Sequence, residues 1–167
     1  LFARIYSKPK NKYLLSTKLP FCSLISVTEK KKEFYKFENY WIKKKDVVPI
    51  SYKKQTFKNI IIFKGIPYKW GGKTYKGIDC SALVQIFFKF NNQYCPRDTK
   101  DQIKYFKKPN NIKKNAIIFW KGHVAVCLSK TLLIHAYGPK KKVLFMNVKK
   151  TIKLIKKTAK LKVIGIR

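Results

Sequence analysis

Acidic residues are scarce in this chain of 167 residues, in which seven Asp and Glu stand against 40 Lys and Arg and the formal net charge is +33. Arginine is scarce too, because only Arg4, Arg97 and Arg167 are arginines. Proteins that read nucleic acids rely on the arginine fork to bind bases and phosphates. The lysine surplus therefore argues against a specific nucleic-acid partner and predicts only nonspecific, salt-sensitive affinity for polyanions. A coding bias toward lysine would explain the charge equally well.

Long apolar runs are absent as well. No run reaches the roughly 18 consecutive apolar residues that a transmembrane helix needs, so we expect no membrane span. Hydrophobic residues nevertheless make up 46% of the chain, which is too high for a disordered protein. A chain of this length can bury one sizeable core, or fold as a small barrel beside a compact catalytic domain. The sequence leaves the oligomeric state open.

The cysteines do not form a close-spaced framework of the kind that disulfide-rich secreted proteins use. There are four of them, at positions 22, 80, 95 and 127. Reduced thiols are the simpler interpretation, and they favour a cytoplasmic location. Because the chain begins with Leu1 rather than Met, the lack of a signal peptide carries little weight, and a periplasmic or extracellular location stays open as the alternative.

Cys80 lies where an irregular loop meets an apolar segment. Glycines at 71, 72 and 77 mark the loop, and four apolar residues then recur at helical spacing: Leu83, Ile86, Phe87 and Phe90. This pattern predicts a helix over residues 80–91 that begins at Cys80 and is capped by Asp79 or Ser81. Free N–H groups and the positive end of the helix dipole favour an anion there. We therefore expect a lowered thiol pKa and donors for an oxyanion.

The only two histidines follow in an ordered way. His123 directly precedes a β-rich run over residues 124–128, and His135 lies within a second run over residues 132–137; three residues separate the two runs. A three-residue hairpin loop places Ala125 opposite His135, so both imidazoles lie on one face of the sheet as diagonal neighbours. A two-residue turn would place them on opposite faces. In the first register the chain supplies a thiol, a base and a group that orients the base, which is the set that nucleophilic catalysis needs.

Each of these residues also has a plainer interpretation. A lone cysteine at a helix start is usually a small buried residue, and a lone histidine on an apolar strand is usually a satisfied core residue. One cysteine and two histidines are also a potential zinc ligand set, although the short ligand spacings typical of zinc sites are missing. The three residues in these contexts together favour catalysis, and we expect no metal and no cofactor.

Five segments carry a resemblance to a known family. They are residues 68–72 (Tyr-Lys-Trp-Gly-Gly), 77–84 (Gly-Ile-Asp-Cys-Ser-Ala-Leu-Val), 96–99 (Pro-Arg-Asp-Thr) with Gln102, 122–126 (Gly-His-Val-Ala-Val) and 134–136 (Ile-His-Ala). Together these segments resemble the NlpC-type cysteine peptidases, papain-like enzymes that cut bacterial cell-wall peptides. The resemblance covers roughly residues 57–167. It implies that Cys80 is the nucleophile, His123 the general base and His135 the residue that orients the base.

The resemblance also implies a substrate. Family members that cut between D-glutamate and the following diamino acid read the free amino end of the peptide beside the cysteine. By similarity, Asp79 and Ser81 bind that amine, and Tyr68 and Thr99 line the same pocket. A carboxylate is the natural partner of an ammonium group. We expect hydrolysis of murein stem peptides with a free N-terminal L-Ala, with an amidase, an acyltransferase or an idle wall-binding module as alternatives.

Two positions depart from the family pattern. Ala82 stands where a glycine usually follows Asp-Cys-Ser, and a helix tolerates this change well. Asn115-Ala116 stands where the family generally has Gly-Asp before the histidine strand. The second departure puts the local turn in doubt.

The expected organisation is a small β-barrel over residues 1–54 and a papain-like catalytic domain over residues 55–167. In the first part we expect strands at 2–6, 21–28, 34–37 and 40–42. Residues 38–42 (Glu-Asn-Tyr-Trp-Ile) weakly resemble the bacterial Src-homology-3-like domains that often precede NlpC-type domains. Polar and basic residues 51–58 are expected to form the linker.

The second part predicts an α+β fold, in which N-terminal helices pack on an antiparallel sheet. The expected helices are residues 57–63, 80–91 and 99–106, the last capped by Asp98 or Thr99. The expected strands are residues 116–120, 124–128, 132–137, 143–148 and 162–167. Residues 153–162 alternate charged and apolar side chains, which we interpret as a solvated face.

Overall fold

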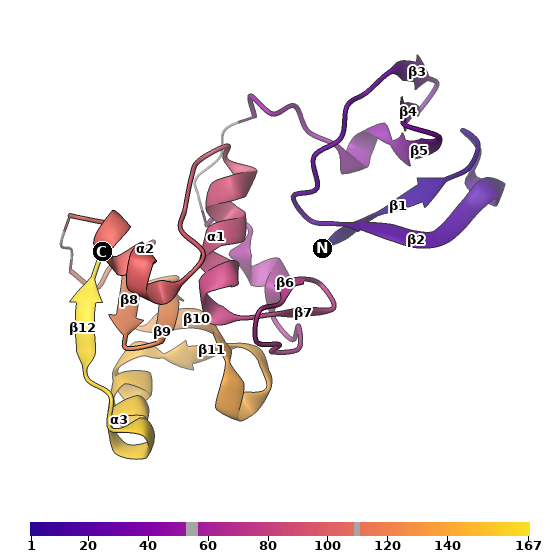
Figure 1. Ribbon diagram of the computed structural model, residues 1–167. Helices are drawn as coiled ribbons and strands as arrows, with labels where there is room; N and C mark the ends of the chain where they lie inside the picture. The colour runs from indigo at the N-terminus through magenta and orange to yellow at the C-terminus, as the bar shows by residue number, and fades with distance from the viewer. Residues whose placement is uncertain (53–56, 109–110) are drawn as a thin grey trace. The chain divides into compact units, whose positions relative to one another are not determined.

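The computed structural model describes residues 1–52, 57–108 and 111–167 (Figure 1). They belong to two compact units, Leu1–Lys53 and Lys54–Arg167. The division falls inside the expected linker, part of which (53–56) lies outside the described residues. Each unit is described by itself below.

The first unit is built on one antiparallel sheet with the strand order β2-β1-β5-β4-β3. Its strands are β1 (Phe2–Tyr6), β2 (Leu14–Pro20), β3 (Glu29–Lys31), β4 (Phe34–Phe37) and β5 (Tyr40–Lys43). Ile5, Phe37 and Ile42 form a small buried core. Among the described residues no pairing joins β2 to β3, so this unit is an open sheet and the expected closed barrel is wrong. Its relation to Src-homology-3-like domains stays a prediction.

One expected strand of this unit is also wrong. Residues 21–28 form a turn followed by irregular chain, and the strand lies just before them as β2. The backbone of Cys22 is left-handed, with φ of 68°, and this interrupts an extended conformation at the start of the apolar run. β2 escaped prediction because it is an edge strand whose middle residues are polar and exposed.

The second unit is an α+β domain, as the sequence predicts. Its main sheet has the order β11-β10-β9-β8-β12, and neighbouring strands are antiparallel. The strands are β8 (Ile117–Trp120), β9 (His123–Cys127), β10 (Leu132–Tyr137), β11 (Lys142–Asn147) and β12 (Val163–Ile166); the helices are α1 (Cys80–Phe90), α2 (Thr99–Tyr105) and α3 (Val148–Ala159). A small hairpin, β6 (Lys73–Thr74) and β7 (Gly77–Ile78), precedes α1. The expected helix at 57–63 is only a 3₁₀ turn, Ile60–Phe63.

Helix α1 forms the centre of this unit because one side of it is almost wholly apolar. Leu83, Val84 and Phe87 are each 1% exposed, and burying a side chain of this kind contributes about 1.5–3 kcal/mol. The helix lies against β9 and β10, so its first residue is held close to the strands that carry the two histidines. Among the residues that the structure describes, no helix has the length and apolar character needed to cross a membrane.

The register of β9 and β10 is the one predicted from the loop length. Cys127 lies opposite Leu133 and Val126 opposite Ile134. Extending this register by one residue places Ala125 opposite His135. Both histidine side chains therefore lie on one face of the sheet.

Helix α3 was not predicted. Asn147 ends β11 and caps the helix, because its side chain accepts from the backbone N–H of Lys150 at 3.0 Å. Val148, Thr151 and Ile155 are buried at spacings of three and four, and this spacing was the signal for a helix. The lysines of residues 153–162 do face solvent, but all but the last few of these residues belong to a helix.

The departure at Asn115 has a structural reason. Its backbone is left-handed, with φ of 68°, and its N–H donates to the carbonyl of Cys127 at 2.8 Å. Glycine and asparagine are the residues that adopt this conformation most readily. Asparagine therefore replaces the family glycine here without loss of the turn that starts β8.

Candidate active site

Cys80 is the first residue of α1, and a tight loop delivers it there. Asp79 is the N-cap, as predicted, and its Oδ1 accepts from the backbone N–H of Ala82 at 2.8 Å. The loop before it passes so close to itself that a Cβ on Gly72 would lie 2.5 Å from the carbonyl oxygen of Gly77. Only glycine fits at position 72, which explains part of the glycine-rich pattern.

The thiol of Cys80 is buried. The backbone N–H groups of Val124 on β9 and of Ser81 and Cys80 at the start of α1 act as donors that lower its pKa. These donors favour the thiolate, but burial outweighs them and raises the pKa of Cys80 to about 11. The predicted lowering of this pKa is therefore wrong for the resting chain. The predicted amide donors are present.

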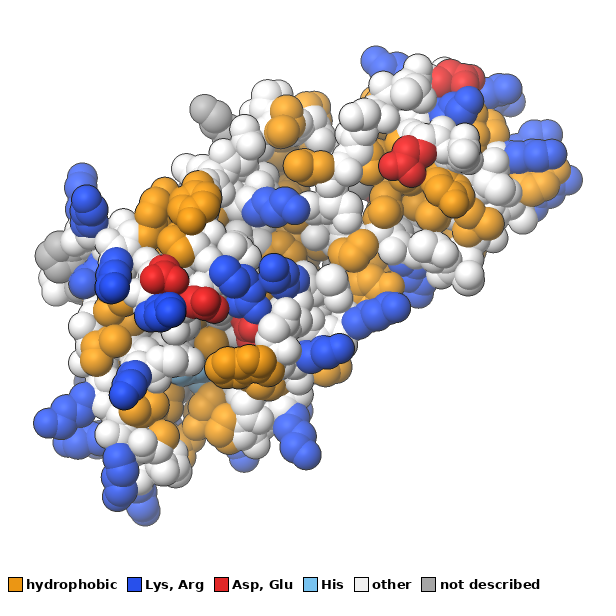
Figure 2. Space-filling view, in the orientation of Figure 1, with side chains coloured by type: hydrophobic (Ala, Val, Ile, Leu, Met, Phe, Trp, Pro, Cys, Tyr) orange, Lys and Arg blue, Asp and Glu red, His pale blue; other side chains and the backbone are white. Residues whose placement is uncertain are grey.

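The two histidines contact each other directly. His123 Nε2 and His135 Nδ1 lie 2.9 Å apart, within hydrogen-bond distance. His135 is completely buried, whereas His123 is half-buried, and Figure 2 shows only a small area of histidine surface. Burial lowers the pKa of His123 to about 4, and burial together with His123 lowers the pKa of His135 to about 3. Both rings are therefore neutral at neutral pH.

His135 is held from two further sides. Its ring stacks on that of Tyr137, with centroids 4.7 Å apart and an interplanar angle of 11°. Its second nitrogen, Nε2, lies 3.2 Å from the sulfur of Met146 on β11. Because His135 has fixed neighbours on both nitrogens and on one ring face, it can hold His123 in one orientation.

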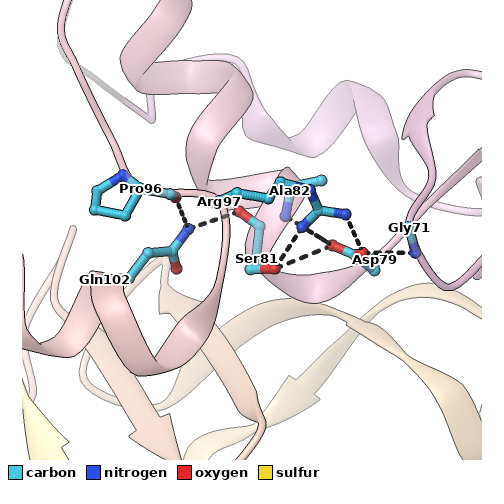
Figure 3. A network of polar contacts seen from close by, with 7 residues as sticks. All are labelled: Gly71, Asp79, Ser81, Ala82, Pro96, Arg97 and Gln102. Carbon is cyan, nitrogen blue, oxygen red and sulfur yellow. Dashed lines mark hydrogen bonds and ion pairs between the residues drawn. The ribbon is translucent and has the colours of Figure 1, made fainter.

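A second polar network joins the start of α1 to the chain that leads into α2 (Figure 3). The guanidinium of Arg97 binds both carboxylate oxygens of Asp79 and donates to Ser81 Oγ at 2.8 Å. Ser81 Oγ also donates to Asp79 Oδ1 at 3.2 Å, and the backbone N–H of Gly71 donates to Oδ2 at 2.9 Å. Together with the N–H of Ala82, these groups supply five donor atoms from four residues, so the carboxylate of Asp79 is fully occupied in this structure.

The charge of Asp79 is stable in this network. Burial acts to raise the pKa of its carboxyl group, but the hydrogen bonds and charge of Arg97, together with the N–H groups of Ala82 and Gly71, hold the pKa below its usual range. An incoming ammonium group would have to share the carboxylate with Arg97 or displace it.

Gln102 joins the same region from α2. Its side-chain nitrogen donates to the carbonyl oxygens of Ser81 and Pro96, each at 2.9 Å, and the residue is completely buried (Figure 3). These bonds tie the chain before α2 to the first turn of α1. They fix the position from which Arg97 reaches Asp79.

Tyr68 and Thr99 are the other two predicted binding residues, and neither belongs to the hydrogen bonds described above for Asp79. Tyr68 is half-buried, and burial, followed by the charges of Cys80 and Asp79, raises the pKa of its hydroxyl. The electrostatic influence of Cys80 and Asp79 indicates that Tyr68 is their neighbour. Thr99 is the half-buried first residue of α2, two residues beyond Arg97. Its place in a binding pocket stays a prediction.

Sequence reasoning assigned no role to Arg97 or Met146. A signal was present for Arg97, because a chain with 40 basic residues contains only three arginines. Lysine cannot replace the planar fork that binds both oxygens of a carboxylate. For Met146 the available signal was weaker, namely that it is the single methionine of the chain.

The assembled groups are suited to one kind of chemistry. A thiol at a helix N-terminus, a neutral imidazole and a second ring that orients it are the components of thiol-based acyl transfer. The sequence profile of the NlpC/P60 family matches residues 65–160, which contain all of these groups. The chain belongs to the NlpC/P60 family. This confirms the family resemblance noted in the sequence.

Curated proteins are also similar in sequence to this chain. The gamma-D-glutamyl-L-lysine dipeptidyl-peptidase of Bacillus subtilis is 29% identical over 152 residues, which are 80% of this chain and 51% of that protein. Dipeptidyl-peptidase 6 of Lysinibacillus sphaericus is 30% identical over 89 residues, which are 52% of this chain and 33% of that protein. The chain thus spans about half the length, or less, of these curated relatives.

Solved structures show the same fold. The crystal structure of an NlpC/P60 family protein from Bacillus cereus has a TM-score of 0.76 at 20% identity and covers 99% of this chain and 60% of its own. The NlpC/p60 domain of the peptidoglycan hydrolase SagA has a TM-score of 0.51 at 26% identity and covers 57% of this chain and 88% of its own. The NlpC/P60 fold of this chain is therefore established.

Proposed function

We propose that this NlpC/P60 protein is a cysteine peptidase of bacterial cell-wall stem peptides. Cys80 is the nucleophile, His123 the general base and His135 the residue that orients His123. The observation that supports these roles best is the 2.9 Å contact between His123 on β9 and His135 on β10, the two strands against which α1 lies with Cys80 as its first residue.

The proposed reaction follows from these positions. His123 takes the thiol proton as the sulfur of Cys80 attacks the amide carbonyl, and the imidazolium then gives that proton to the leaving amine. Backbone N–H groups at the start of α1 stabilise the negative oxygen that forms during attack. Water, activated by the same imidazole, then hydrolyses the thioester and restores the free thiol.

The proposed scissile bond joins D-glutamate through its side-chain carboxyl to a diamino acid, in peptides with a free N-terminal L-Ala. The name of the Bacillus subtilis relative, a gamma-D-glutamyl-L-lysine dipeptidyl-peptidase, supports this choice. The amine-binding role falls to Asp79 and Ser81 beside the nucleophile, with Tyr68 and Thr99 as further pocket residues. Because Arg97 occupies Asp79 at rest, we propose that the amine shares this carboxylate with the guanidinium.

Defined peptides test this proposal. The purified chain is incubated with L-Ala-γ-D-Glu-L-Lys and with the same peptide acetylated on the alanine nitrogen, and products are identified by mass spectrometry. We expect release of L-Ala-D-Glu from the free peptide and at least about a hundred-fold slower cleavage of the acetylated one. Losing a hydrogen bond to a charged group commonly costs about 1.5–3 kcal/mol, and the upper end of this range corresponds to that factor.

Three outcomes would contradict the proposal. Equal rates on both peptides would refute recognition of the amine. Cleavage at another amide, or acyl transfer without hydrolysis, would indicate an amidase or acyltransferase. No reaction with either peptide, combined with binding to cell walls, would indicate an idle wall-binding module. A Cys80→Ala protein is the matched control for contaminating peptidases.

We also propose that the protein works in the cytoplasm. Cys80, Cys95 and Cys127 are free thiols in the structure, and a reducing compartment preserves such thiols. A free alanine amine arises only after the stem peptide has been released from its sugar, which suits a role in processing released peptides. Fractionation of cells that express the full-length protein tests the location, and recovery outside the cytoplasm would refute it.

A further inference from the structure

Met146 contacts the buried end of the histidine pair. It lies on β11, two residues beyond Leu144, which is the direct partner of His135 on β10. This register brings its sulfur to 3.2 Å from His135 Nε2, while His135 Nδ1 lies 2.9 Å from His123 Nε2. The three side chains thus form one continuous row from β11 through β10 to β9.

The chemistry of a thioether fixes where the protons lie in this row. A methionine sulfur accepts weak hydrogen bonds but has no proton to donate. His135 is completely buried and neutral, so it carries one N–H, and the contact with sulfur favours that proton on Nε2. Nδ1 of His135 is then an acceptor, and the proton between the two rings belongs to His123 Nε2.

The position of this proton decides whether Nδ1 of His123 can act as a base. A neutral imidazole with its proton on Nε2 has a free lone pair on Nδ1, which is what a general base requires. The opposite arrangement disables the base. A proton on His135 Nδ1 would donate to His123 Nε2 and leave the only proton of His123 on Nδ1.

We propose that Met146 is a positioning residue that sets the tautomer of both histidines and so keeps Nδ1 of His123 free to accept the thiol proton. This inference rests on the proposed role of His123 as the base. In the proton transfer the S–H bond of Cys80 breaks and an N–H bond forms at His123 Nδ1. The proton on His123 Nε2 stays in place, donated to His135, and His135 keeps its own proton toward the sulfur.

Histidine tautomers can be measured directly in this chain because it contains only two histidines. The full chain is labelled with ¹⁵N-histidine, and the nitrogen chemical shifts distinguish protonated from unprotonated ring nitrogens. We expect the Nε2–H tautomer for both rings in the unsubstituted protein near pH 7. The Nδ1–H tautomer for His135 would overturn the proposal whatever the variants show.

Three variants separate the acceptor from packing. Met146→Leu keeps the volume and removes the sulfur, and we expect a mixed tautomer signal for His135 with kcat reduced about tenfold and KM nearly unchanged. Met146→Gln supplies an amide oxygen as acceptor and is expected to restore the Nε2–H signal and most of kcat. Leu144→Val alters packing opposite His135 without touching the acceptor, and we expect less than about a twofold change in kcat.

Two results would refute the role of Met146: an unchanged tautomer in Met146→Leu, or equal losses of kcat in Met146→Leu and Leu144→Val. Should Met146→Leu fail to fold, the tautomer of the unsubstituted protein and of Met146→Gln decides. The tautomers are measured without substrate. A failure of the proposed peptidase function can therefore be distinguished from a failure of the proposed role of Met146. A chain that cleaves no stem peptide, yet shows Nε2–H rings that change in Met146→Leu, would refute the peptidase role and support the role of Met146.

Discussion

The contact between Arg97 and Asp79 makes a sharp prediction about stability. Replacing Arg97 by glutamine removes two of the five donors to the Asp79 carboxylate and leaves the other three: the N–H groups of Gly71 and Ala82 and the hydroxyl of Ser81. We expect Arg97→Gln to lower the free energy of unfolding of the second unit by about 3 kcal/mol at pH 7.

The magnitude follows from burial. The Asp79 side chain is 9% exposed and that of Arg97 is 25% exposed. Removing one partner of a buried ion pair typically costs about 3–5 kcal/mol, because the other charge stays behind in a poorly solvated place. The lower end applies here, since Arg97 is partly solvated and three donors remain on the carboxylate.

The effect should depend on pH in a definite direction. The pKa of Asp79 is lowered in the folded chain, so its ion pair contributes fully above the unfolded pKa of about 3.9 and is lost as pH falls through the folded value. Without Arg97 the folded pKa rises, because burial is then opposed by fewer donors. The difference between the two proteins is therefore large at pH 7 and shrinks as the pH falls from the folded pKa of the variant toward the lower folded pKa of the unsubstituted protein.

Urea unfolding, followed by circular dichroism and by hydrogen exchange of the α1 peptide, measures this difference at pH 7, 5 and 3.5. Lys104→Gln is the matched control, because it removes one positive charge from an exposed position of α2. The double variant Arg97→Gln with Asp79→Asn should recover part of the loss, since no unpaired charge remains. A cost for Arg97→Gln no larger than that of Lys104→Gln, or one that is constant with pH, would refute the reasoning.

Three further predictions concern the catalytic groups. Cys80→Ala should abolish hydrolysis of the free-amine peptide and leave the circular dichroism spectrum unchanged, and surviving turnover would exclude Cys80 as nucleophile. Because burial lowers the pKa of His123 to about 4 and the base must be unprotonated, kcat/KM should stay level down to about pH 5 and fall near pH 4; an acid limb near 6.5 would contradict this. His135→Asn should retain more kcat than His135→Ala, because its amide oxygen can still accept from His123, and equal losses in the two would count against the orienting role.

The parts of the site that could be predicted depend on local rules. Helix α1 follows from apolar residues at helical spacing, and the side-by-side histidines follow from the length of one hairpin loop. In both cases the interacting residues are few positions apart along the chain, or are related by a fixed strand register. The family motifs then identified which of these residues share a role.

The parts that could not be predicted depend on distant segments or on burial. Arg97 reaches Asp79 across 18 positions, and only the docking of α2 through Gln102 brings them together. Asp79 therefore appeared in the sequence as a free carboxylate beside the nucleophile, whereas the fold neutralises it with an arginine. The strand β2 was missed for a related reason, because an exposed edge strand needs little apolar content.

The direction of the Cys80 pKa shows how burial reverses a local argument. A helix N-terminus favours a thiolate, but the same packing that holds Cys80 against β9 removes it from water, and the pKa rises to about 11 while that of His123 falls to about 4. Both pKa shifts reflect the cost of a single isolated charge in a buried place, a thiolate at Cys80 or an imidazolium at His123. A proton that moves from sulfur to imidazole creates two opposite charges together, which attract one another and cost less than either alone. The backbone N–H groups of Val124, Ser81 and Cys80 act to lower the thiol pKa and so favour the negative charge on sulfur. The resting site is therefore neutral, and its reactivity depends on whether His123 presents a free lone pair to the thiol. That depends in turn on where the proton of His135 lies.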